Sequence, residues 1–255
     1  MKQLSHSLQV LAAAALSIGL PALAADAAPQ PSVVIVHGAF ADGSDWAKVI
    51  PLLQARGIRV TAVQNPLSSL EDDVAAAKRA IDAAPGKVVL VGHSWGGTVI
   101  TQAGANDKVA SLVYIAAFAP DVGQATGELG KAYPPAPGLA HLSADAAGYL
   151  RLTDEGMSRH FAQDLPRAQT AVMAATQGPI FGKAFEQPVT TAAWKNKPSW
   201  YLVAGADHMI QPDLQRDFAK KIGAHVSQVQ TSHVPQQAAP AKVAAIILEA
   251  VKQSQ

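Results

Sequence analysis

The hexapeptide Gly92-His93-Ser94-Trp95-Gly96-Gly97 constrains this chain more than any other segment. An apolar, β-branched run over residues 87–91 precedes it, and an apolar stretch typical of a helix continues to about Gly104. A G-x-S-x-G pattern between a strand and a helix predicts a sharp turn that requires small residues on both sides of the serine. The turn exposes the hydroxyl at a helix N-terminus, where free N–H groups and the helix dipole favour negative charge. We therefore predict that Ser94 is a nucleophile.

Strand-like and helix-like segments alternate around this turn. Continuous apolar, β-branched runs are typical of strands buried on both faces of a sheet. They predict strands over 32–37, 58–63, 87–91, 109–118, 199–204 and 225–230. Apolar residues at three- and four-residue steps predict helices over 45–56, 70–81, 212–222 and 240–252, the second capped by Ser69. The alternation predicts an α/β fold with a mostly parallel sheet and helices on both faces.

Residues 119–197 interrupt the alternation, since they are rich in proline and contain no long β-branched run. Residues 145–160 and 166–175 are predicted to be helices. We interpret the whole segment as a helical cap inserted over the sheet. Residues 25–255 then form a single domain with this insertion.

A serine hydroxyl is a weak nucleophile until an oriented base removes its proton. In this topology the acid and then the base follow the serine along the chain. Of the eight histidines, His233 alone follows the final strand, so we predict that it is the base. Asp207 lies just after the 199–204 strand, at the carboxyl edge of the sheet, and is the predicted acid. Asp121, after the preceding strand, is the alternative.

A tetrahedral intermediate requires two hydrogen-bond donors for its oxyanion. One is expected from the backbone N–H of Trp95, directly after the nucleophile. The other is expected from the loop after the first strand, where Gly38 permits a turn, which favours Ala39 with Phe40 as the alternative. Aromatic residues are expected to line the substrate pocket: Phe40, Phe118, Tyr133, Phe161 and Trp194.

Together these motifs resemble the α/β-hydrolase superfamily over residues 32–252. The resemblance rests on V-H-G-A (36–39), Trp46, G-H-S-W-G-G (92–97), A-F-A-P (117–120), G-A-D-H (205–208) and S-H-V-P (232–235). Within the superfamily the chain is most similar to the plant methylesterase and hydroxynitrile lyase group and its bacterial esterase relatives. The resemblance implies that Ser94, Asp207 and His233 form a catalytic triad, with Ala39 and Trp95 at the oxyanion positions.

Two departures from the lyases favour ester hydrolysis. The lyases have a lysine directly after the catalytic histidine, where this chain has Val234, and a threonine where it has Gly38. The expected function is therefore a carboxylesterase that cleaves small, largely apolar esters through an acyl-enzyme on Ser94. Two alternatives use the same fold: a cofactor-free haloperoxidase or C–C or hydroxynitrile lyase with the same triad, and a non-catalytic small-molecule binding protein.

Composition and the absence of known ligand-binding motifs exclude or disfavour several classes of protein. Apolar residues make up 49% of the chain and charged residues 15%, which excludes an intrinsically disordered chain. Twenty basic residues face 19 acidic ones without any block of like charge, so a nucleic-acid partner is not expected. No phosphate-binding or dinucleotide motif and no H-E-x-x-H is present, and the histidines are scattered along the sequence, so no metal or cofactor is expected.

The N-terminal residues have the order of a secretory signal peptide. Lys2 precedes an apolar stretch from Leu8 to Leu20, and Ala22-Leu23-Ala24 supplies the small residues of a cleavage site. The stretch is shorter than the ~20 residues that span a bilayer. We expect cleavage after Ala24 and a mature protein in the bacterial periplasm or medium, with no membrane attachment. Because cysteine is absent, an exported chain must be stabilised by its core and not by disulfides.

Overall fold

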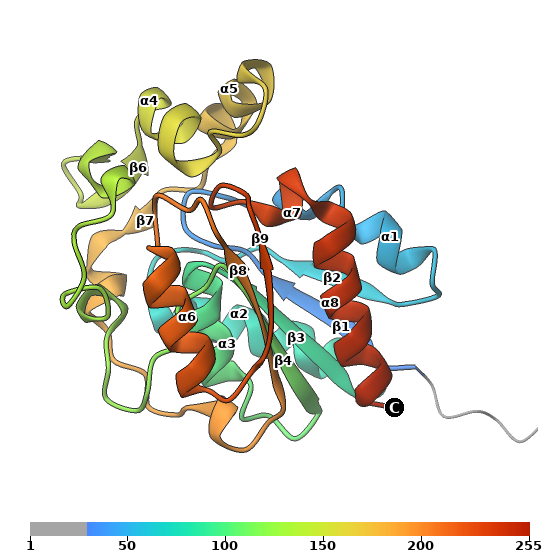
Figure 1. Cartoon of the computed structure of the whole chain (residues 1–255). Helices are drawn as coiled ribbons and strands as arrows, with labels where there is room; N and C mark the ends of the chain where they lie inside the picture. The colour runs from blue at the N-terminus through green and yellow to red at the C-terminus, as the bar shows by residue number, and fades with distance from the viewer. Residues whose placement is uncertain (1–29) are drawn as a thin grey trace, which may run out of the picture.

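The computed structural model describes residues 30–255 (Figure 1). The predicted signal peptide, residues 1–24, lies outside the described residues. Within residues 30–255, none of the helices is both long and apolar enough to cross a membrane.

A six-stranded sheet forms the centre of the molecule. Its strands are β1 (Ser32–Val36), β2 (Val60–Val63), β3 (Val88–His93), β4 (Val109–Ile115), β8 (Ser199–Ala204) and β9 (His225–Val229). They lie in the order β2-β1-β3-β4-β8-β9, and every adjacent pair is parallel. The predicted parallel α/β architecture is confirmed. Because all the strands run the same way, the loops after β1, β3, β8 and β9 meet at one edge.

Side chains alternate between the two faces along each strand and form two apolar clusters. On one face, Val34, Leu90 and Tyr114 pack with α2 (Leu70–Ala83), α3 (Trp95–Ala103) and α6 (Pro212–Lys221). On the other, Val33 and Val89 pack with α1 (Ile50–Gln54) and α8 (Pro240–Gln253). Helices thus cover both faces of the sheet (Figure 1).

The helix predicted over 45–56 is instead divided in two. A 3₁₀ turn, η1 (Gly43–Trp46), precedes α1, and Pro51 occupies the first turn of α1. Proline has no backbone N–H and therefore fits only the first turn of a helix. Trp46, Val49 and Leu53 still face one cluster, which is why the sequence has a continuous helical periodicity.

The cap over residues 119–197 contains strands as well as helices. An antiparallel sheet forms from β5 (Leu142–Ala144), β6 (Tyr149–Leu152) and β7 (Ile180–Phe181). Its helical parts are α5 (Arg167–Thr176), the single turn α4 (Asp154–Gly156), the π-helical turn η4 (Met157–Phe161), and the 3₁₀ turns η2 (Thr126–Glu128), η3 (Pro137–His141), η5 (Gly182–Glu186) and η6 (Ala193–Lys195). The short helix α7 (Pro235–Ala238) follows the last loop of the main sheet.

The helix predicted over 166–175 is confirmed as α5, but the one over 145–160 is wrong in its first half. There the carboxylate of Asp145 accepts hydrogen bonds from the backbone N–H groups of Ala147 and Tyr149, both at 2.9 Å. Gly148 adopts a left-handed conformation with φ of 85°. This side chain–backbone turn competes with helix formation and links β5 to β6 as a hairpin.

Candidate active site

Ser94 lies between β3 and α3 in a strained backbone conformation. Its φ of 53° and ψ of −120° are rarely adopted by a residue with a side chain. Gly96 and Gly97 make the turn possible, because a Cβ on either would overlap the backbone carbonyl of Val36 or Phe118 respectively. The hexapeptide therefore forms the sharp strand–turn–helix that its sequence predicts.

His233 and Asp207 meet at the same edge of the sheet. Asp207 Oδ2 accepts a hydrogen bond from His233 Nδ1 at 2.7 Å, and both side chains are buried. Since Nδ1 carries the proton in this contact, Nε2 of the neutral ring is left with its lone pair, as a base requires.

The rest of the Asp207 carboxylate is held by three further donors. Oδ1 accepts from the backbone N–H groups of Met209 at 2.7 Å and Ile210 at 3.0 Å. Oδ2 also accepts from Nε2 of Gln215 at 2.7 Å. The carboxylate is thus fully satisfied, which fixes its orientation toward His233.

Gln215 was not identified from the sequence. It is fully buried on α6, and its Oε1 accepts from the backbone N–H of Ala204 at 2.9 Å. A glutamine at an inward-facing position of an amphipathic helix was the available signal.

The alternative acid, Asp121, lies elsewhere. It forms a surface ion pair with Lys195 at 2.5 Å, and that interaction lowers the pKa of its carboxyl group. Among the described residues, Asp207 is the carboxylate that His233 contacts.

His93, the last residue of β3, packs against the base. The two rings lie 4.7 Å apart between centroids, and His93 Nε2 donates to the backbone carbonyl of His233 at 2.8 Å. Burial holds the pKa of His93 well below its ordinary value, so the ring is neutral. His93 therefore supports the backbone of the His233 loop.

The first-strand loop is oriented by His37. The ring accepts from the backbone N–H of Asn65 at Nε2, 3.0 Å, so its Nδ1 donates to the carbonyl of Gly38 at 2.8 Å. Burial lowers the pKa of His37, which agrees with this neutral tautomer. In a trans peptide the C=O and the following N–H point in opposite directions. The Ala39 N–H is consequently directed away from His37.

Ser94, His233 and Ala39 line one cavity of about 440 Å³ between the sheet edge and the cap. Of the five predicted pocket residues, Phe40, Phe118, Tyr133 and Phe161 line it. Trp194 does not, and its indole instead donates to the carbonyl of Pro120 at 2.9 Å. Sequence reasoning missed most of the aliphatic wall: Leu139, Leu142, Leu150, Met209, Ile210 and Leu214.

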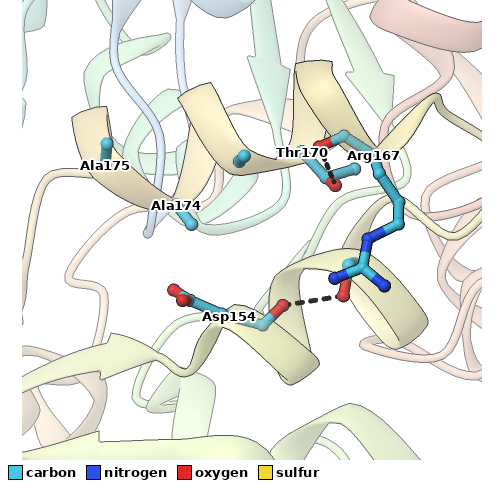
Figure 2. A pocket seen from close by; sticks show the side chains of 7 residues that line it. Asp154, Arg167, Thr170, Ala174 and Ala175 are labelled. Atoms are coloured by element: carbon cyan, nitrogen blue, oxygen red, sulfur yellow. Dashed lines mark hydrogen bonds between the residues drawn. The ribbon is translucent and has the colours of Figure 1, made fainter.

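A smaller groove of about 260 Å³ lies within the cap, away from Ser94 and His233. Figure 2 shows Arg167, Thr170, Ala174 and Ala175 on α5 facing Asp154 across it. It holds none of the predicted catalytic residues.

Three histidines that are distant in sequence are neighbours in space, contrary to the scattered arrangement expected. His141 stacks on His160 with ring centroids 4.6 Å apart, and Nδ1 of His160 lies 3.3 Å from Nδ1 of His208. Within residues 30–255, no three histidine or acidic side chains are arranged to hold a metal ion.

Comparison with known proteins identifies the family. The sequence profile of the "Alpha/beta hydrolase family" matches residues 33–246. The chain belongs to this family. It is therefore an α/β-hydrolase enzyme, and the resemblance to the methylesterase group and bacterial esterases is confirmed.

Several relatives of this α/β hydrolase are named as esterases or hydrolases. The pyrethroid hydrolase of Sphingobium wenxiniae is 29% identical, over 85% of this chain and 86% of the relative. Methylesterase 2 of Arabidopsis thaliana is 24% identical, over 79% of this chain and 89% of the relative. The crystal structure of polyneuridine aldehyde esterase has a TM-score of 0.76 at 20% identity, covering 87% of this chain and 99% of the other. That last likeness concerns the fold alone.

Proposed function

We propose that this α/β hydrolase is a serine carboxylesterase. The observation that carries the proposal is the Asp207–His233 hydrogen bond at 2.7 Å, beside a strained Ser94 that lines the same cavity as His233. A nucleophile, a base in the correct tautomer and a buried orienting carboxylate are the parts that acyl transfer requires. The esterase and hydrolase names of its relatives support ester cleavage.

The reaction follows from these positions. Nε2 of His233 takes the proton of the Ser94 hydroxyl as Oγ attacks the ester carbonyl. The backbone N–H groups of Trp95 and Ala39 stabilise the resulting oxyanion. The intermediate collapses as His233 returns the proton to the leaving alcohol, which leaves an acyl group on Ser94.

Water completes the cycle. His233 Nε2 removes a proton from the water as it attacks the acyl carbonyl, and then returns that proton to Ser94 as the carboxylic acid departs. Asp207 stays ionised and stabilises the imidazolium at each stage.

The cavity favours uncharged substrates. Its walls are mainly aliphatic and aromatic, from Phe40 and Phe118 on the sheet side to Leu142, Leu150 and Phe161 on the cap side. Lys131 also lines the cavity, but its side chain is largely exposed and lies 3.8 Å from Glu128. A carboxylate or ammonium group placed against the apolar walls would lose its hydration. We expect the enzyme to cleave esters whose acyl and alcohol parts are both largely apolar.

Pre-steady-state hydrolysis of p-nitrophenyl esters tests the proposal. The wild-type enzyme is expected to release a burst of p-nitrophenol equal to the enzyme concentration, which Ser94→Ala abolishes. Ser44→Ala is the matched control, because it removes the hydroxyl of an exposed serine outside the cavity and keeps the burst. Unchanged turnover in Ser94→Ala would contradict the proposal.

A further inference from the structure

The Trp95 side chain is tied to a buried carboxylate that the mechanism does not use. Trp95 is fully buried, and its indole N–H donates to Oδ2 of Asp73 on α2 at 2.7 Å. The same residue supplies the backbone N–H that we assign to the oxyanion. A side-chain contact of Trp95 can therefore influence the donor itself.

Burying the carboxyl group of Asp73 costs folding free energy. It is fully buried, and within residues 30–255 it forms no ion pair with a lysine or arginine. Burial raises the pKa of its carboxyl group to about 6, against the opposing effect of hydrogen bonds from Trp95 and Leu67. An apolar side chain at this position would avoid the desolvation cost of the carboxylate.

The carboxylate bridges two backbone segments that are both in unusual conformations. Its Oδ1 accepts from the N–H of Leu67 at 2.7 Å, and Leu67 has a φ of 59°. Its Oδ2 contacts Trp95, which directly follows the strained Ser94. Asp73 thus joins the segment before α2 to the turn that presents the nucleophile.

The indole is also held by the cap. The ring of Trp95 meets Phe185 edge to face, with centroids 5.2 Å apart and an interplanar angle of 77°. Phe185 lines the cavity that contains Ser94. With Asp73 at its N–H and Phe185 against its ring, the indole is held in one orientation.

The residues that flank the donor offer few side chains to anchor it. Ser94 precedes Trp95 in a strained conformation, and Gly96 and Gly97 follow without side chains. Trp95 is therefore the first residue of α3 whose side chain can anchor the helix start. Removing the anchor would let the Trp95 N–H shift relative to the oxyanion.

We propose that Asp73 is a positioning residue, which holds the Trp95 indole so that the Trp95 backbone N–H faces the oxyanion. The inference rests on the proposed esterase mechanism and extends it to a residue outside the substrate cavity. Its contact is specific to a tryptophan after the nucleophile, because the indole supplies the N–H that Asp73 accepts.

The test compares Asp73→Asn, Trp95→Phe and the double variant with wild type. The asparagine variant keeps the shape of Asp73 but cannot accept both N–H donors, and the phenylalanine variant keeps a buried ring without the indole N–H. Each single variant is expected to lower kcat for a p-nitrophenyl ester by about 10- to 100-fold with KM nearly unchanged. The double variant is expected to be no slower than the slower single variant, because both changes break one contact.

A trifluoromethyl ketone separates positioning from folding, because its adduct with the serine places an oxyanion between the two donors. Its affinity is expected to fall by the same factor as kcat. Asp72→Asn, the neighbouring exposed carboxylate of α2, is the matched control and leaves both quantities unchanged.

Wild-type kcat and inhibitor affinity in folded Asp73→Asn would overturn the inference, as would additive losses in the double variant. If Asp73→Asn does not fold, Trp95→Phe alone decides, and unchanged inhibitor affinity there overturns it. If Ser94→Ala retains activity in the same assay, the esterase mechanism itself fails, and that outcome is distinct from the others.

Discussion

At the scale of single residues, the site contains two features that lower the stability of the fold. Ser94 has a backbone conformation that a side chain disfavours, and Asp73 is an acid in an apolar environment. Ser94 directly precedes the proposed oxyanion donor, and Asp73 contacts the side chain of that donor residue. Strain at such positions persists only where the surrounding structure enforces it.

Glycine at position 94 should relieve the backbone strain of the Ser94 turn. We expect Ser94→Gly to be more stable than Ser94→Ala by about 1–2 kcal/mol, since only glycine adopts the Ser94 φ and ψ without strain. Chemical denaturation of the two inactive variants measures the difference. Equal stabilities would contradict a strained turn.

Asp73 should make stability depend on pH. Its pKa is about 6 when folded and near 3.8 when unfolded, so the folded chain binds the proton more tightly. This contribution is complete below pH about 4 and is lost as pH rises through about 6. Relative to Asp73→Asn, wild type is expected to lose about 2 kcal/mol of unfolding free energy between pH of about 4 and about 6, and about 3 kcal/mol over the whole titration.

Urea denaturation of both proteins across this range, taken as a difference, isolates that carboxyl group. A difference that does not change with pH, or that grows as pH rises, would exclude a raised pKa for Asp73.

Local sequence patterns predicted the turn that presents Ser94, because a G-x-S-x-G sequence between a strand and a helix leaves few backbone conformations open. Gln215, Asn65 and Asp73 could not be found in this way. Each acts through hydrogen bonds to a residue on another element or loop: Gln215 to Asp207, Asn65 to His37 and Asp73 to Trp95. Such contacts depend on helix and loop placement, which periodicity does not specify.

At the scale of elements, the sheet was predictable, whereas in the cap only α5 was. Strands β1, β3, β4 and β8 are buried on both faces, so their sequences are continuous apolar runs. The cap strands are short and partly exposed, and a two-residue strand such as β7 has no recognisable pattern. The Asp145 turn then replaced the expected helix start by a hairpin.

The histidine cluster of His141, His160 and His208 joins the cap to the sheet edge. Its contribution to the stability of the fold should fall in acid. Burial, followed by His141 and His208, lowers the pKa of His160, while Glu155 opposes and Arg159 adds to the effect. The unfolded chain therefore binds the proton first as pH falls below about 6.5. Relative to His160→Gln, wild type is expected to lose stability between pH of about 7 and about 5.

Thermal unfolding of both proteins over that range checks the sign. If the wild type gained stability relative to His160→Gln on acidification, a lowered pKa for His160 would be excluded.

At the scale of the whole molecule, two apolar clusters enclose the sheet and place four loops at one edge, under the cap. The low content of charged residues, 15%, suits a sheet that is covered on both faces. The chain has no cysteine, so these clusters must supply its stability without any contribution from disulfides.

We propose that the enzyme is exported and begins at Ala25 after cleavage. Intact-mass analysis of protein from the periplasm or medium of a bacterial host is expected to match residues 25–255. A mass that includes residues 1–24 would contradict the signal-peptide assignment.

The central claim is that Ser94 is the activated nucleophile of an esterase. Peptide mass mapping after reaction with a fluorophosphonate tests it most directly, since the probe bonds only to a serine that a neighbouring base activates. We predict one adduct per chain, on the peptide containing Ser94, that is absent in Ser94→Ala and strongly slowed in His233→Gln. An adduct on another residue, or no adduct on the folded enzyme, would contradict it.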